Sequence, residues 1–287
     1  MNVRTGIRVI FAAACLLASA PTFAAGPAAV RKQAEASMLV TGNIQVDTRG
    51  KVTGYTLDHK DKLPSGVVRL LDQAVPNWTF EPVLMNGKAV NASTDMSIRV
   101  VAKKDSEETY SIGIRGASFG DNSARPEEQP QAESLAPPDY PENAVRAGVT
   151  GTVYLLVRVE RDGRVGDVIA EQTNLGVVAD EKSMAGWRRR LEDVSIRQSR
   201  KWKFVPPLEG KTAGEAFWVV RVPVVYSLDG PPKEPLYGVW EGYIPGPRHS
   251  SPWGDNEGIG FSPDTLAPGG AYVAGSGLKL KTELSGI

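Results

Sequence analysis

The sequence predicts an α+β protein built from two similar units, a first unit over residues 36–103 and a second unit over residues 137–228. Three observations lead to this prediction. Each unit contains runs in which apolar and polar residues alternate, which is the period of a half-buried strand. Each unit has one stretch whose apolar residues recur at helical spacing, so that they share one face of a helix. After that stretch, each unit carries the motif Trp-x-Phe-x-Pro, at Trp78 and at Trp202.

The N-terminus has the features of a secretory signal. Two arginines precede an apolar run over residues 9–20, and small residues then stand at Thr22 and Ala24. This order predicts a signal peptide over residues 1–24 that is cleaved on export. Two alternatives stay open. One is an uncleaved membrane anchor, although a span needs about 20 mostly apolar residues, and the other is a lipoprotein that uses Cys15.

The first unit is predicted to open with a hairpin, because two alternating runs flank a tight turn at residues 48–50. A short helix follows, with Ser65 as its N-cap and Pro76 at its end. A last alternating run closes the unit. The predicted strands cover residues 38–46, 51–57 and 96–102.

The second unit gives the clearer pattern. Pro141 suits the first position of a short helix, and Gly148 lies just past its end. Residues 151–159 alternate strongly, and Gly163 supplies the positive φ of a hairpin turn. Asp180 opens a long helix whose acidic start and basic end suit the helix dipole. The remaining predicted strands cover residues 165–170 and 217–226.

Two segments outside the units are expected to lack regular structure. Residues 104–136 are rich in Glu, Ser, Gln and Pro, which predicts a linker. Within it, Tyr110, Ile112 and Ile114 recur at every second position and predict a short strand as the alternative. The tail, residues 229–287, is rich in Gly, Pro and Ser and shows no helical or strand period. A mostly disordered tail is therefore expected.

The two units also align with each other. With Gly50 placed on Gly163, the apolar positions of the preceding strands coincide without a gap. The Trp-x-Phe-x-Pro motifs and the closing strands then follow in the same order. The corresponding motif residues are Trp78 and Trp202, Phe80 and Phe204, and Pro82 and Pro206. This order predicts an internal duplication, with chance similarity of two small hairpin-helix-strand units as the alternative.

Composition narrows the function. Lys plus Arg and Asp plus Glu both number 33, so the chain lacks the basic excess of a nucleic-acid-binding protein. Cys15, the one cysteine, falls in the predicted signal, which excludes disulfides and thiolate sites from the mature chain. His59 and His249 stand on unlike segments, and the sequence has no nucleophile–base pair and no phosphate loop. We therefore expect no catalytic residue, metal site, cofactor, small-molecule substrate or nucleic-acid partner.

Taken together, the motifs of the second unit resemble the C-terminal domain of the TonB energy-transducer family. The resemblance covers residues 137–228 and rests on order and spacing, since any single motif would be a weak signal. The first unit resembles a degenerate copy that lacks the Tyr-Pro helix. The motif residues, which are given structural roles, are Tyr140, Pro141, Gly151, Gly163, Trp202, Phe204 and Pro206, with Trp78, Phe80 and Pro82 in the first unit.

The resemblance implies a three-stranded antiparallel sheet with helices on one face, in two tandem copies. The family holds the TonB box of an outer-membrane transporter by pairing it as an added strand on the last strand of the domain. Pro223 lacks an N–H and so suits an edge strand. Carried over to this chain, the candidate partner-binding residues are Trp218, Val220, Val222, Val224, Tyr226 and Asp139.

The chain departs from the family's energy transducers in its N-terminal part. Those proteins keep a membrane helix with a histidine and a long Pro-rich spacer, whereas the first histidine here is His59. The resemblance therefore implies a periplasmic protein–protein interaction module that binds an envelope protein, such as a TonB-dependent outer-membrane receptor. One alternative is a genuine energy transducer, anchored in the inner membrane and coupling its proton motive force to outer-membrane transport. An enzyme is the other, and a homodimer is left open.

Overall fold

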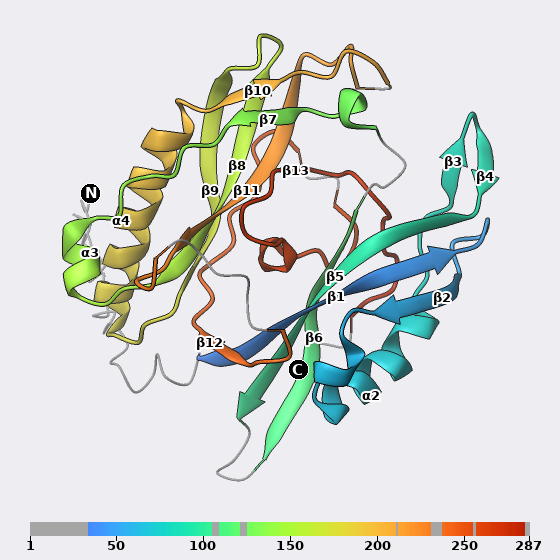
Figure 1. The fold of residues 1–287 in the computed structure, drawn as a ribbon, viewed down its shortest axis with the longest axis horizontal. Helices are drawn as coiled ribbons and strands as arrows, with labels where there is room; N and C mark the ends of the chain where they lie inside the picture. Colours follow the sequence, from blue (N-terminus) through green and yellow to red (C-terminus); the bar gives the residue numbers. More distant parts are fainter. Residues whose placement is uncertain are drawn as a thin grey trace, which may run out of the picture.

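In a computed structural model of the protein, residues 34–104, 109–120, 125–210, 212–230, 237–254 and 257–284 are described. They form a mixed α+β structure with several antiparallel sheets, which confirms the α+β prediction (Figure 1). The predicted signal peptide at residues 1–24 lies outside the described residues. Among the helices that are described, none is long and apolar enough to cross a bilayer.

The larger of the two main sheets is formed mostly by the first unit. Its strands run in the order β2 (Val52–Leu57), β1 (Glu35–Val46), β5 (Ala92–Lys104) and β6 (Tyr110–Phe119), and β12 (Glu241–Tyr243) pairs with the start of β1. Alternate residues of β1, such as Val40 and Ile44, are fully buried. They share a core with Val67 and Leu71 of helix α2 (Ser65–Ala74), so this helix closes one face of the sheet.

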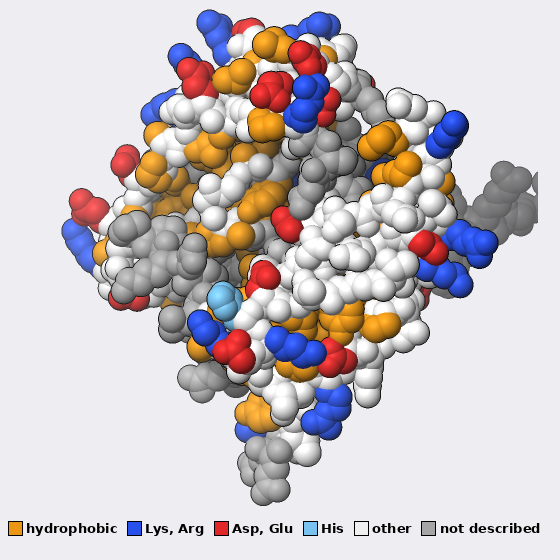
Figure 2. Space-filling model, turned by 45° about the vertical axis from the view of Figure 1, so that its right-hand side comes forward, with side chains coloured by type: hydrophobic (Ala, Val, Ile, Leu, Met, Phe, Trp, Pro, Cys, Tyr) orange, Lys and Arg blue, Asp and Glu red, His pale blue; other side chains and the backbone are white. Residues whose placement is uncertain are grey.

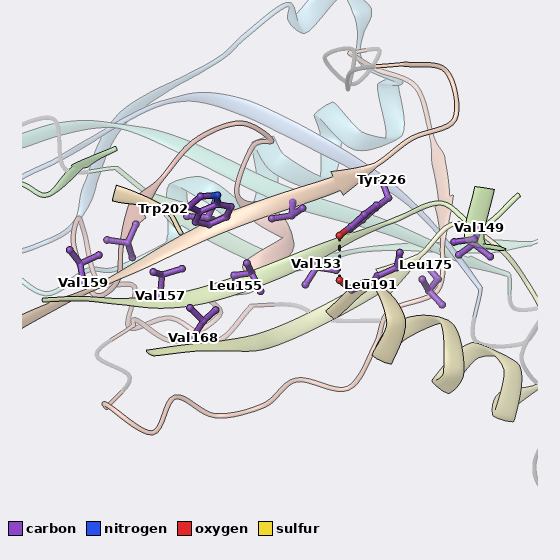
Figure 3. Close-up of a cluster of buried hydrophobic side chains, with 14 of the residues drawn as sticks. Val149, Val153, Leu155, Val157, Val159, Val168, Leu175, Leu191, Trp202 and Tyr226 are labelled. Carbon is purple, nitrogen blue, oxygen red and sulfur yellow. Dashed lines mark hydrogen bonds between the residues drawn. The ribbon is translucent and has the colours of Figure 1, made fainter. Parts of the chain in front are cut away.

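The other main sheet belongs to the second unit. Its strands run in the order β9 (Val165–Leu175), β8 (Gly151–Glu160), β11 (Phe217–Tyr226) and β13 (Tyr272–Val273). Helix α4 (Glu181–Ser199) begins where the Asp180 carboxylate accepts a hydrogen bond from the Ser183 N–H at 3.0 Å. Its Leu191 lies in one buried cluster with Val153 and Leu155 of β8, as Figure 3 shows.

Shorter elements connect these parts. β3 and β4 form a separate hairpin, and β7 pairs with β10. The short elements are η1 (Lys60–Lys62), η2 (Val75–Asn77), β3 (Val83–Met85), β4 (Lys88–Val90), η3 (Pro126–Glu128), β7 (Gln131–Ser134), α3 (Glu142–Arg146), β10 (Lys203–Val205) and η4 (Pro263–Thr265).

The two units repeat the same connection with the same hydrogen bonds. In each, a hairpin leads to a helix, then to the Trp-x-Phe segment, and then to a strand that pairs with the first hairpin strand. The Phe80 N–H donates to the Gly50 carbonyl at 2.7 Å, and the Phe204 N–H donates to the Gly163 carbonyl at 2.9 Å. Strands β1, β2 and β5 thus correspond in order to β8, β9 and β11.

The segment at residues 104–136 is more regular than the linker that composition led us to expect. The alternation from Tyr110 onward marks a ten-residue strand, β6, which pairs with β5. Further on, β7 pairs with β10, with Ala132 opposite Phe204. The outer edge of β5 carries unpaired backbone groups until a strand covers it, and β6 does so while burying Ile114 in the first core.

The expectation of a disordered tail is corrected by the structure. Figure 1 shows the tail, in orange to red, running between the two main sheets. It adds β12 to β1 and β13 to β11, and it buries Ile244 in the second core and Leu280 in the first. The tail pairs with these strands over only two or three residues at a time. Such short contacts leave no period in the sequence, which is why composition alone was misleading.

Candidate functional site

Strand β11 is the candidate site, because the resemblance assigns partner binding to this strand. Along its whole length β11 pairs with β8, from Phe217 opposite Glu160 to Tyr226 opposite Gly151. On its other side β13 pairs with two residues, Val220 and Arg221. β11 is therefore an edge strand over most of its length, with a short cover near its middle.

One hydrogen bond shows which backbone groups of β11 face away from β8. The Ala274 N–H donates to the Val219 carbonyl oxygen at 2.8 Å. Because alternate residues of a strand turn their N–H and C=O groups to opposite neighbours, Val219, Arg221, Pro223 and Val225 face away from β8. Pro223 therefore stands where its missing N–H costs no bond to β8. Among the described strands, none pairs with residues 223–226 on this outward side.

The side chains predicted to bind a partner lie on the covered face of β11. All five of them on this strand are at most 8% exposed, and they pack in the core beneath α4. They are Trp218, Val220, Val222, Val224 and Tyr226. The strand can thus offer a partner its backbone, while these side chains hold the strand in place. The alternation of residues along β11 could have predicted this burial, since one face of the strand must enter the core.

Tyr226 fixes the end of β11 next to the start of the second unit. Its hydroxyl, which Figure 3 shows pointing toward α4, lies 2.7 Å from the Ser195 hydroxyl. Its ring lies 5.1 Å from the ring of Tyr140. Burial raises the pKa of Tyr226 to about 12, so the phenol stays neutral. Tyr140 in turn donates to the Val149 carbonyl. The exposed Asp139 is therefore held near the uncovered end of β11.

A cavity of about 470 Å³ lies beside the uncovered end of β11. Both units and the tail line it, and its walls include Pro223 and Val225 of β11. Arg99 of the first unit donates through Nε to the Asp264 carbonyl at 2.8 Å. The Tyr243 hydroxyl donates to the Asp264 carboxylate at 3.2 Å, and burial raises the pKa of Tyr243. The cavity thus offers polar and charged groups, among them Arg99 and Asp264, and room for side chains next to the unpaired strand edge.

A group of buried charges lies where the tail crosses the second sheet. Arg221 of β11 and Glu171 of β9 are 2% and 1% exposed, and Arg221 Nε lies 2.7 Å from Glu171 Oε2. From the tail, Arg248 lies 2.8 Å from Glu171, and Glu257 pairs with Arg221. The ring of Phe261 lies 4.4 Å from the Arg221 guanidinium. Sequence reasoning missed this group because its members are far apart in the chain.

The remaining motif residues have structural surroundings. The Trp202 indole N–H donates to the Ala136 carbonyl at 2.8 Å, and both Trp202 and Phe204 are buried in the second core. Trp78 and Phe80 are buried in the first core. At Gly151, a Cβ would lie 2.3 Å from the Asn174 carbonyl oxygen. Pro141 is the N-cap of α3, while Pro82 is exposed and Pro206 partly buried.

No metal centre is assembled in the described part of the chain, where no three His, Cys, Asp or Glu side chains are placed to hold an ion. The face drawn in Figure 2 carries Lys and Arg side chains interspersed with Asp and Glu. Recognition through backbone groups fits such a mixed surface better than recognition through one sign of charge.

Comparison with known proteins identifies a partial relative. Over 100 residues, the chain is 35% identical to Protein TonB of Xanthomonas campestris pv. campestris, in two strains. Part of this chain is similar to TonB. The matched stretch is 34% of this chain and 38% of the curated relatives, so the chain spans well under half of their length. No family model matches the chain. The resemblance to TonB that the motifs predicted is thereby confirmed as a distant, partial similarity.

Proposed function

We propose that this protein is a non-enzymatic binding protein of the bacterial envelope that takes up an extended segment of another protein as an added strand on β11. The observation that carries the proposal is the outward edge at residues 223–226, which no described strand pairs with and which lies beside a cavity of about 470 Å³. The partial similarity to TonB supports it, since the family resemblance implies partner binding on the last strand of the domain.

The physical basis is strand addition. The Pro223 and Val225 carbonyls and the Val225 N–H lie on the outward side, as derived from the bond between Ala274 and Val219. An added strand would satisfy these groups and extend the sheet, so that main-chain hydrogen bonds give affinity. Its side chains would alternate between the face of the sheet that bears the cavity and the opposite face, which gives selectivity.

The two units are proposed to be tandem TonB-like modules of which the second binds. Their matching connections and hydrogen bonds support the duplication. In the first unit, β5 takes the place of β11, and β6 covers its outer edge from Met96 to Lys104. That edge has no room for another strand, so we assign the first unit a structural role.

An outer-membrane receptor of the TonB-dependent kind is the proposed partner. The direct test uses synthetic peptides carrying the TonB boxes of the host's own receptors and measures their binding by fluorescence anisotropy. We expect Val225→Pro to weaken binding about tenfold, because it removes an outward N–H and leaves a partner carbonyl unpaired, worth roughly 1–3 kcal/mol. The fold should survive, since the Val225 N–H is not needed by β8.

Val225→Thr is the matched control, because it keeps the N–H and the β-branched shape. It should bind the peptides like the unchanged protein. Equal affinities for the proline and threonine variants would contradict strand addition at this edge. A chain that binds none of the peptides would contradict the proposed partner.

The alternative of an anchored energy transducer differs from our proposal at the N-terminus. We expect the protein made in its host to begin near Ala25 and to be recovered in the soluble periplasmic fraction. N-terminal sequencing of fractionated cells measures both. A membrane-bound chain that still begins at Met1 would favour the energy transducer.

A further inference from the structure

The tail places a minimal strand on the candidate edge. Tyr272 lies opposite Arg221, and Val273 lies opposite Val220. Gly269 and Gly275 flank this strand and both adopt positive φ, 81° and 72°. Neither Tyr272 nor Val273 is fully buried. A strand of two residues with glycine turns on both sides can detach at the cost of few hydrogen bonds and little buried surface.

The first unit provides the contrast. There β6 pairs with nine residues of β5, and it buries Ile114, Ala117 and Phe119 in the first core. The corresponding edge of β11 is covered at only two positions. The corresponding edge is thus paired over nine residues in the first unit and over two residues in the second.

Charged groups hold the tail in register on either side of β13. The Glu257 carboxylate accepts a hydrogen bond from the Gly275 N–H at 2.6 Å and pairs with Arg221. Arg248 pairs with Glu171 at 2.8 Å. If the tail left, Arg221 and Glu171 would remain paired with each other at 2.7 Å. Release of the tail therefore leaves no buried charge without a partner in this pair, an outcome that would be costly.

We infer that β13 is an internal competitor for the strand-addition edge, and that an external strand pairs with Val219 and Arg221 only after displacing Tyr272 and Val273. The inference rests on the proposed function. The inference also describes the external segment, because β13 occupies the position on β11 that this segment would take. That segment is extended, carries uncharged aromatic or β-branched side chains, and has no proline where Ala274 donates to Val219.

A reversible disulfide tests the inference. Val220 and Val273 form the non-hydrogen-bonded pair next to the bond between Ala274 and Val219, and Cα atoms of such pairs lie about 4.5 Å apart. This spacing suits a disulfide. The double variant Val220→Cys and Val273→Cys, with Cys15→Ser to avoid a third thiol, locks the tail when oxidised and frees it when reduced. Circular dichroism checks that both forms stay folded.

The probe is a synthetic peptide with the sequence of residues 269–276, which supplies the competing strand from outside. We expect the reduced form to bind it at least about tenfold more tightly than the oxidised form. Ala274→Pro, which removes the donor to Val219, should also bind it more tightly than the unchanged chain. Equal affinities of the oxidised and reduced forms would overturn the inference.

The receptor peptides separate this failure from failure of the proposed function. If they bind the oxidised and reduced forms equally, β13 does not compete, while strand addition at residues 223–226 stands. If they bind neither form, the proposed function fails and the inference fails with it. Tighter binding to the reduced form supports both.

Discussion

At the residue scale, two glycines set how each unit closes. Gly50 and Gly163 adopt φ of 78° and 79°, and a Cβ on either would lie 2.0 Å from the carbonyl oxygen of Phe80 or Phe204. Glycine is required at both positions for its backbone conformation and for the close approach of the Trp-x-Phe segment. Both turns were predicted from the sequence, and the positive φ was predicted for Gly163, but the close approach of the Trp-x-Phe segment could be seen only in the folded chain.

Gly163→Ala should therefore cost more than the change of a turn glycine that has free space around it. We expect a loss of about 2–4 kcal/mol in the free energy of unfolding, from the left-handed backbone and from displacement of the bond to Phe204. Gly148→Ala is the control, because Gly148 also has positive φ, 67°, but a Cβ there meets nothing within 4 Å. It should lose about 1–2 kcal/mol. Urea unfolding measures both, and equal losses would contradict the steric argument.

At the element scale, the sequence predicted the elements that carry a periodic pattern or a capping residue, and it missed the strands of two or three residues in the tail. The strands of both hairpins and helix α4 were predicted, because β8 alternates over ten residues and α4 has an acidic cap at Asp180. The outward and inward faces of β11 were not assigned, although the burial of Trp218 and Val220 follows from the same alternation. β12 and β13 were missed, since strands of two or three residues carry no period. The partners of Arg221 could not be predicted, because ion pairs between distant segments leave no local signal.

At the scale of the whole molecule, the tail joins the two units. Between its described ends it contributes Tyr237 and Leu280 to the first core and Ile244 to the second. The Ile244 N–H and carbonyl bond with Leu175 at 2.7 and 3.1 Å, directly after β12 pairs with β1. A short run of tail therefore touches both sheets. This arrangement explains how a tail that competes at β11 can stay attached elsewhere when β13 leaves.

Ile244→Ala tests this coupling between the units. The Ile244 side chain is 2% exposed in the second core, and its removal should cost about 2–5 kcal/mol locally, as for other large-to-small core changes. Because Ile244 directly follows β12, we expect faster hydrogen exchange at Leu175 in β9 and also at residues 35–37 in β1, which pair with β12. Ile259→Ala is the control, since Ile259 is 52% exposed in the same tail. Faster exchange confined to β9 would mean that the tail packs on each unit independently. Faster exchange in both sheets, with Val46 at the far end of β1 unchanged, would place the link at the junction of β12 and Ile244.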